Sequence, residues 1–158
     1  MTLFDAIRSG SLTNVELILE QDPNLVNIAD AKGFSPLVLS TYLGFIEIAK
    51  ALIDAGADVN LQDKVGNTAL MGVCFKGNIS IIGMLLDAGA DINILNQNNS
   101  SALIFAASFG QEKAVRYLID KGADIHPKDQ TGRNALDYAR EKKMGSVVEM
   151  LLNMSPNG

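Results

Sequence analysis

Four sets of residues recur along this chain at intervals of 33 positions. The sets are Asp30, Asp63, Asn96 and Asp129; Leu37, Leu70, Leu103 and Leu136; Gly44, Gly77 and Gly110; and the Gly-Ala-Asp triplets that begin at Gly56, Gly89 and Gly122. All four sets keep one register, which chance does not produce. A fixed period of this length is typical of proteins built from tandem units, each of which packs mainly against its neighbours.

Within one repeat the sequence predicts two short helices followed by a turn. In the second unit, Ser35 is suited to cap the first helix, Pro36 to occupy its first position, and Gly44 to end it. A second helix is expected from about Ile46 to Ala55, because apolar residues recur there at helical spacing. The turn-forming residues of 58–66 predict a tight turn or small hairpin that projects from the helices.

Helices of this length are not stable alone in water, so each unit must bury its apolar side chains against the next. The expected internal spine consists of Leu70 and Leu103 with the pairs Leu85-Leu86 and Leu118-Ile119. We therefore expect a single all-α domain over residues 1–158. Its expected units are an N-terminal cap over 1–29, then 30–62, 63–95 and 96–128, a C-terminal cap over 129–154, and a frayed tail over 155–158.

Composition narrows the classes of function. The formal net charge is −5 and no run of Lys and Arg offsets it, so a nucleic acid would be repelled. Cys74 is the only cysteine and His126 the only histidine, which excludes an intrachain disulfide and a Cys/His zinc site. The N-terminus lacks the apolar run of a signal peptide, and no stretch is long enough to span a membrane, so a cytoplasmic location is expected.

The landmarks of each unit match a known family. The pattern Asp-x-x-Gly-x-Ser/Thr-x-Leu, then Gly, then Gly-Ala-Asp-x-Asn, with a period of 33, resembles the ankyrin repeat. The resemblance implies an α-solenoid, in which each unit is an antiparallel helix pair with an outward β-turn finger. It also implies that the fingers and the first helices form a concave surface that binds partners.

The chain departs from the family pattern in ways that affect packing. No unit keeps the histidine of the family's Thr-Pro-Leu-His opening; Val38, Met71 and Ile104 stand in its place, so apolar contact is expected there. Lys143 occupies a position that is glycine in three other units. A lysine disfavours the left-handed backbone, which predicts a strained turn or a turn shifted toward Gly145.

Five further positions bear on local stability. Asn99 replaces a finger glycine, and asparagine tolerates the left-handed conformation. Gly72 and Gly83 fall inside the expected helices of the third unit, where each destabilises the helix by about 1 kcal/mol relative to alanine. The middle of the stack is therefore expected to be its least stable part. At the N-terminus, Thr2 and Asp5 resemble a capping box.

The family's concave surface, transferred position by position, gives candidate partner-binding residues. They are Phe34, Tyr42, Leu43, Lys64, Val65, Phe75, Lys76, Phe109 and Arg133. The aromatic members and Leu43 are expected to align across the units as one apolar stripe. An exposed stripe would mark an interaction surface. Alternatively, these side chains pack against the adjoining units, and the sequence leaves both interpretations open.

We therefore expect a monomeric, non-catalytic module that binds a protein partner, without a metal or other cofactor and without a nucleic-acid or membrane partner. One alternative is an inhibitory or targeting subunit of a cytosolic enzyme, and another is a small-molecule or metal sensor. Catalysis is not expected, because Cys74 is predicted to be a buried thiol and His126 to brace a loop. Asp58, Asp91 and Asp124 are expected to be turn residues rather than a converging acid pair.

Overall fold

The computed structural model describes residues 1–155, which form ten α-helices and one 3-10 helix. The first helices of the pairs are α1 (Leu3–Arg8), α3 (Pro36–Leu43), α5 (Ala69–Lys76), α7 (Ala102–Ser108) and α9 (Ala135–Glu141). The second helices are α2 (Leu12–Gln21), α4 (Ile46–Asp54), α6 (Ile79–Asp87), α8 (Glu112–Asp120) and α10 (Gly145–Met154). The 3-10 helix, Pro23–Asn27, follows α2. Apart from Ser155, the predicted frayed tail lies outside the described residues.

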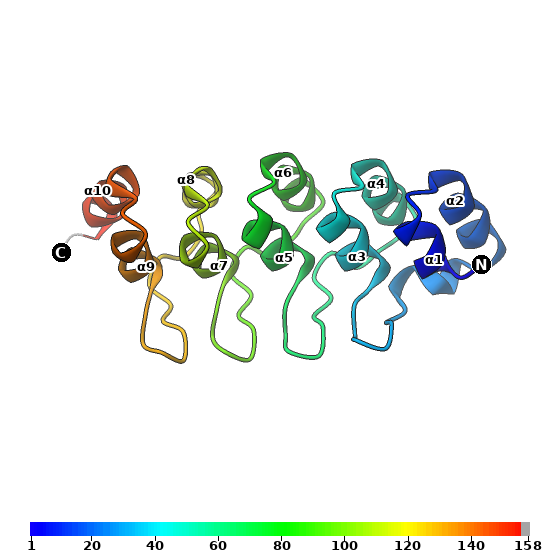
Figure 1. Ribbon diagram of the computed structural model, residues 1–158, viewed down its shortest axis with the longest axis horizontal. Coiled ribbons are helices and arrows are strands. Elements are labelled where there is room, and N and C mark those ends of the chain that lie inside the picture. Colours follow the sequence, from blue (N-terminus) through cyan, green and yellow to red (C-terminus); the bar gives the residue numbers. More distant parts are fainter. Residues whose placement is uncertain (156–158) are drawn as a thin grey trace.

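The helices form two rows, and the chain runs along the stack from one end to the other (Figure 1). The first helices, called the inner helices below, contact one another in sequence from α1 to α9. The second helices, called the outer helices, form the other row, and the long loops, or fingers, project away from them. No strand occurs among residues 1–155. The predicted all-α solenoid is confirmed.

The predicted caps account for where the helices begin. Ser35, Thr68 and Ser101 each accept a hydrogen bond from the backbone N–H three residues later, at 3.2, 3.3 and 3.2 Å. These bonds satisfy N–H groups that have no partner inside the helix. The capping box of Thr2 and Asp5 is also confirmed, since each side chain accepts a hydrogen bond from the other's backbone N–H.

The core follows the leucine positions of the repeat. Leu37, Leu70 and Leu103 are each 1% exposed, as expected for the internal spine. Leu136 is only partly buried, because its helix pair has a neighbour on one side alone. Leu86, which was also expected in the spine, is only partly buried. The stack therefore has a continuous core that thins at the C-terminal end.

The departures from the family pattern are accommodated by packing. Met71 and Ile104, at the family's histidine position, are buried, and Val38 is half-buried. These side chains replace a polar network with apolar contact, as predicted. Gly72 and Gly83 lie within α5 and α6, so the prediction of two glycines inside the helices of the third unit is confirmed.

Two residues other than glycine have a positive φ among residues 1–155, namely Asn99 at 56° and Lys143 at 58°. Of the two alternatives predicted for the last turn, the shift toward Gly145 is wrong, because Gly145 is the first residue of α10, and the strained turn at Lys143 is found instead. The Met144 N–H donates to the Ala139 carbonyl at 2.9 Å, in the register that the other units use. The last unit thus keeps the turn geometry of the other units, and Lys143 adopts the left-handed backbone conformation that disfavours lysine.

The fingers are joined edge to edge by one recurring position. The Lys64 ammonium donates to the Ala31 carbonyl at 2.8 Å, the Gln97 amide to the Lys64 carbonyl at 2.9 Å, and the Gln130 amide to the Gln97 carbonyl at 2.8 Å. The Gln97 backbone N–H also donates to the Val65 carbonyl at 3.0 Å. Each finger is therefore fixed against its neighbour instead of projecting separately.

A second series of hydrogen bonds links the loops that follow the outer helices. In each link an asparagine side-chain oxygen accepts from the backbone N–H of the aspartate in the next unit. The links are Asn27 with Asp58, Asn60 with Asp91, and Asn93 with Asp124, at 2.8, 2.7 and 2.8 Å. The predicted turn role of these aspartates is confirmed. His126 takes part through its backbone N–H, which donates to the Asp124 carboxylate at 3.0 Å.

Candidate partner-binding surface

A groove of about 520 Å³ lies along the inner helices beside the fingers, on the surface called the inner face below. Its lining comes from α1, α3, α5 and α7 and from the fingers that precede α3 and α5. The large apolar side chains that line it are Phe34, Val38, Leu39, Tyr42, Leu43, Phe75 and Phe105. Pockets of this size with apolar walls and a few polar groups are typical binding sites.

Four of the predicted partner-binding residues line this groove, namely Phe34, Tyr42, Leu43 and Phe75. Tyr42 and Leu43 are 43% and 40% exposed. Phe34 and Phe75 are half-buried, and the Phe75 ring packs against Phe109 of the next unit. The two interpretations of the stripe, exposure and packing, therefore apply to different members of it.

Phe109 extends the apolar surface beyond the groove. Its ring and that of Phe75 form an edge-to-face pair with centroids 4.4 Å apart and planes at 82°, and it stacks on Phe105 at 6.5 Å. Edge-to-face and offset pairs of this kind are favourable aromatic arrangements. Because Phe109 remains 52% exposed, it is held in place by its neighbours and still presents a large apolar surface to solvent.

The predicted cations lie outside the groove lining and have intramolecular contacts. The Lys76 ammonium lies 4.2 Å from the centre of the Tyr42 ring, a cation–π contact between α5 and α3. The Lys64 ammonium is bonded to the Ala31 carbonyl in the neighbouring finger. Val65, next to it, is 51% exposed and presents an apolar side chain on the finger. Lys76, Lys64 and Val65 therefore belong to the rim of the groove rather than to its floor.

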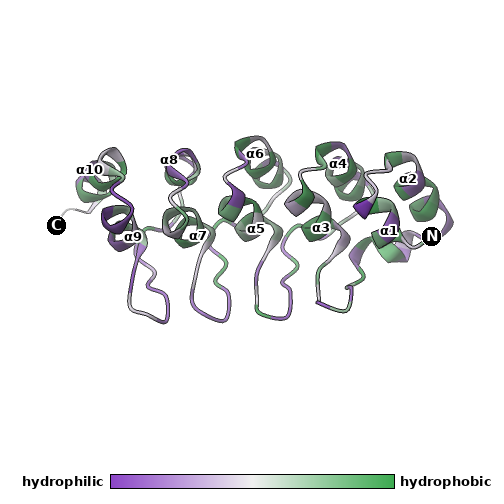
Figure 2. Cartoon of the chain, in the orientation of Figure 1, coloured by the Kyte–Doolittle hydropathy of each residue, from purple (hydrophilic) through white to green (hydrophobic). Residues whose placement is uncertain are grey.

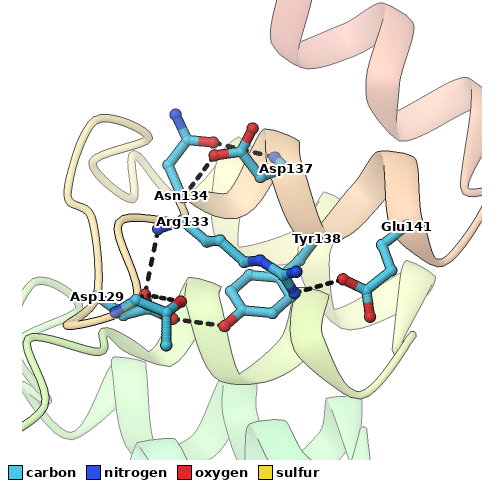
Figure 3. Close-up of polar contacts among 7 residues, drawn as sticks. Asp129, Arg133, Asn134, Asp137, Tyr138 and Glu141 are labelled. Atoms are coloured by element: carbon cyan, nitrogen blue, oxygen red, sulfur yellow. Dashed lines mark hydrogen bonds and ion pairs between the residues drawn. The ribbon is translucent and has the colours of Figure 1, made fainter.

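Arg133 belongs to a polar network in the last helix pair (Figure 3). It bonds Glu141 at 2.5 Å, its guanidinium lies 5.5 Å from the Tyr138 ring centre, and the Tyr138 hydroxyl donates to Asp129 at 2.5 Å. Partial burial works to raise the pKa of Asp129, but hydrogen bonds, led by those from the Thr131 and Tyr138 hydroxyls, hold it below its ordinary value. The same bond from Tyr138 to Asp129 raises the pKa of Tyr138. Arg133 is therefore engaged within its own unit.

The charged groups that line the groove balance one another. Arg8 and Lys32 carry positive charge, and Asp30 and Asp63 carry negative charge. Arg8 lies 3.6 Å from Asp30 and forms an ion pair with it. The apolar walls, rather than a net charge, therefore distinguish the groove from the rest of this acidic molecule.

Outside the groove, the described residues include few side chains placed for catalysis or metal binding. Cys74 is fully buried, and this burial raises the pKa of its thiol far above the ordinary value, so the reactive thiolate is disfavoured. Residues 1–155 contain no group of three or more His, Cys, Asp or Glu side chains placed to hold a metal ion. In the same part of the chain, every helix is too short or too polar to cross a membrane.

A second hollow, of about 580 Å³, lies between the outer helices α2 and α4. Its charged lining includes Glu16, Glu20, Glu47 and Lys50, and the last two are paired at 3.0 Å. These charged side chains are exposed, and the rest of the lining includes no aromatic ring, unlike the groove on the inner face.

Among the groove residues that sequence reasoning missed, Leu39, Gly72 and Phe105 form one series. They occupy one register of the repeat, since each lies 33 positions from the next, and Tyr138 continues the series. The 33-residue period could therefore have identified these residues as members of one surface. Because the residue at this register changes from leucine to glycine to phenylalanine, the size of the side chains on the groove floor changes from unit to unit.

Paired helices stacked in one register, with a groove along their inner row, define a helical repeat protein. The family model for ankyrin repeats matches residues 3–96 and 70–157, which together cover nearly the whole chain. The chain belongs to the ankyrin repeat family.

Curated proteins with similar sequences match a shorter part of the chain. Ankyrin repeat and SAM domain-containing protein 6 is 35% identical in Danio rerio and 36% identical in Mus musculus, in each case over 57 residues. That stretch is 36% of this chain and only 8% and 6% of the two relatives. The chain thus spans a small fraction of these larger proteins.

Proposed function

We propose that this chain is a non-catalytic binding module that holds a protein partner on its inner face. Ankyrin repeats are generally protein–protein interaction modules, and the family is typically non-catalytic. The observation that carries the proposal is the apolar groove of about 520 Å³ together with the exposed rings of Tyr42 and Phe109 beside it. Large aromatic side chains of this kind are the usual anchors of protein interfaces.

The rigidity of the inner face supports this proposal. The three side-chain bonds between successive fingers fix the rim, and the contact between Phe75 and Phe109 fixes one wall. A partner therefore meets a surface that is already ordered. Binding to such a surface loses little conformational entropy, which favours affinity.

The distribution of apolar residues favours the part of the inner face between α3 and α7. Figure 2 shows apolar colouring on α3, α5 and α7, whereas α9 is largely hydrophilic. In the last unit, Tyr138 of α9 and the finger residues Arg133 and Asp129 are already bonded within their own unit. We therefore propose that the middle of the stack makes the central contact and that the last unit lies at the edge of the interface.

Affinity capture with matched variants tests this function. The bait is the full chain, and the variant Tyr42→Ala/Phe109→Ala removes the two most exposed rings of the inner face. The control is Leu17→Ala on the outer helix α2, where the side chain is 49% exposed, close to the value for Phe109. Partners retained from a native extract are identified by mass spectrometry and then titrated against each protein.

We expect the double variant to bind a captured partner at least about tenfold more weakly, while Leu17→Ala binds like the unmodified chain. Circular dichroism spectra that stay the same show that the fold is retained. Equal binding by the double variant, or loss only in Leu17→Ala, contradicts the proposal. If the partner is an enzyme, its activity with and without the chain separates inhibition from targeting.

A further inference from the structure

Gly72 is an interior residue of an inner helix, where glycine destabilises the helix relative to alanine. It lies at the fourth position of α5, and it does not have the positive φ that would require glycine. A Cβ added there would meet no atom within 4 Å. Neither backbone strain nor close packing therefore accounts for a residue that weakens the helix.

The missing side chain leaves space in the groove floor. The residues at the same register in the adjacent units are Leu39 and Phe105, and all three line the groove. Two large side chains thus stand on either side of a residue that has none. The result is a notch, defined here as the space over Gly72 between Leu39 and Phe105, with the ring of Phe75 also lining the groove.

A carboxylate lies beside the same groove. One oxygen of Asp63 accepts the backbone N–H groups of Val65 and Asn67, at 3.0 and 2.9 Å. The other oxygen has no hydrogen bond or ion pair within residues 1–155. At the equivalent positions, the second oxygen of Asp30 faces Arg8 and that of Asp129 accepts from Tyr138.

Asp63 is half-buried, whereas Lys32, a cation of the groove that forms no ion pair within residues 1–155, is exposed. An exposed ammonium is well solvated and contributes little to specificity. A partly desolvated carboxylate gains more from a charged donor. The overall charge of −5 acts in the same direction, because it attracts a basic partner.

From this geometry we infer the chemistry of the segment that the groove recognises. It is a polypeptide segment that inserts one bulky apolar side chain into the notch over Gly72 and directs a lysine or arginine to Asp63. This inference rests on the proposed function, since it names the kind of partner that the inner face takes.

Selection from a display library of random dodecapeptides on the full chain tests the inference. Gly72→Leu places a side chain in the notch, and its Cβ meets no atom within 4 Å. Asp63→Asn removes the charge and keeps the turn, as Asn96 makes the same two backbone bonds at 2.9 and 2.9 Å in the next finger. Gly145→Leu is the matched control, because Gly145 is also helical, also open, and far along the chain in α10.

We expect the unmodified chain and Gly145→Leu to select the same peptides, in which one bulky apolar residue and one basic residue keep a constant spacing. Gly72→Leu is expected to bind those peptides at least about tenfold more weakly. Asp63→Asn is expected to retain the apolar preference and lose the basic one.

The outcomes separate this inference from the proposed function. Selected peptides that bind Gly72→Leu unchanged but fail to bind Tyr42→Ala/Phe109→Ala would overturn the notch and leave the inner face as the binding surface. An acidic consensus would overturn the role of Asp63. A library that yields no binding peptide would overturn the inference as a whole, while capture of a partner through Tyr42 and Phe109 would still support the proposed function.

Discussion

Replacing Leu103 with alanine tests the stacking that holds the molecule together. Leu103 is 1% exposed and lies in α7, which packs against both α5 and α9. Because neighbours on two sides hold the cavity open, we expect a loss of about 3 kcal/mol in the free energy of unfolding, within the usual range of about 2–5 kcal/mol for such changes. For 158 residues, that loss corresponds to a fall in Tm of about 9 °C.

Urea denaturation followed by circular dichroism at 222 nm gives the free energy of unfolding, with Leu136→Ala as the comparison. Leu136 occupies the same register but is only partly buried and has a neighbour on one side. We expect Leu136→Ala to cost about 1–2 kcal/mol. An unchanged midpoint for Leu103→Ala, or an equal loss in both variants, would refute the description of a core that is continuous through the middle and thinner at the end.

Three further predictions concern local features. Lys143→Gly relieves a left-handed lysine and should raise the free energy of unfolding by about 1 kcal/mol in urea denaturation; a decrease would show that the turn is not strained. Gly72→Ala should also stabilise the fold by about 1 kcal/mol, because it improves the helix without a clash, and a lower Tm would contradict this. Tyr138→Phe removes a hydrogen bond that helps to lower the pKa of Asp129, so NMR titration of that carboxyl should show a higher pKa. A carboxyl whose pKa is lowered in the folded state contributes stability that is present above its unfolded pKa and is lost as the pH falls through its folded pKa. The stability difference between the two proteins should therefore be present at about pH 6 and shrink as the pH falls through the folded pKa of Asp129; a difference that does not shrink in acid would contradict the assignment.

Much of the fold could be predicted because it depends on local signals that repeat. The cap residues Ser35 and Thr68, and the buried spine leucines Leu70 and Leu103, act through their own helix or the adjacent unit, so a fixed spacing is enough to recognise them. Lys143 shows the limit of local reasoning. Its own preference favours a different turn, but the register of the whole stack imposes the left-handed one.

The candidate site could be predicted only in outline. The period places Phe75 and Phe109 on the same face, but their exposure depends on how their rings meet, and Phe109 keeps the larger exposed surface. Lys64 resembles a free rim cation in sequence, whereas its ammonium is bound to a carbonyl of the neighbouring finger. The sequence predicts only a weak point at Gly72, whereas its place in the groove lining and the open space around it depend on the folded stack.

Hydrogen–deuterium exchange of the chain, alone and bound to a captured partner, tests most directly whether the inner face is the binding surface. Binding there should slow exchange at the finger amides of Val65 and Gln97 and at the C-terminal ends of α3, α5 and α7, where Tyr42, Phe75 and Phe109 lie. Exchange in the outer helices α4, α6 and α8 should change little. Protection confined to those outer helices, with the fingers unaffected, would contradict the account.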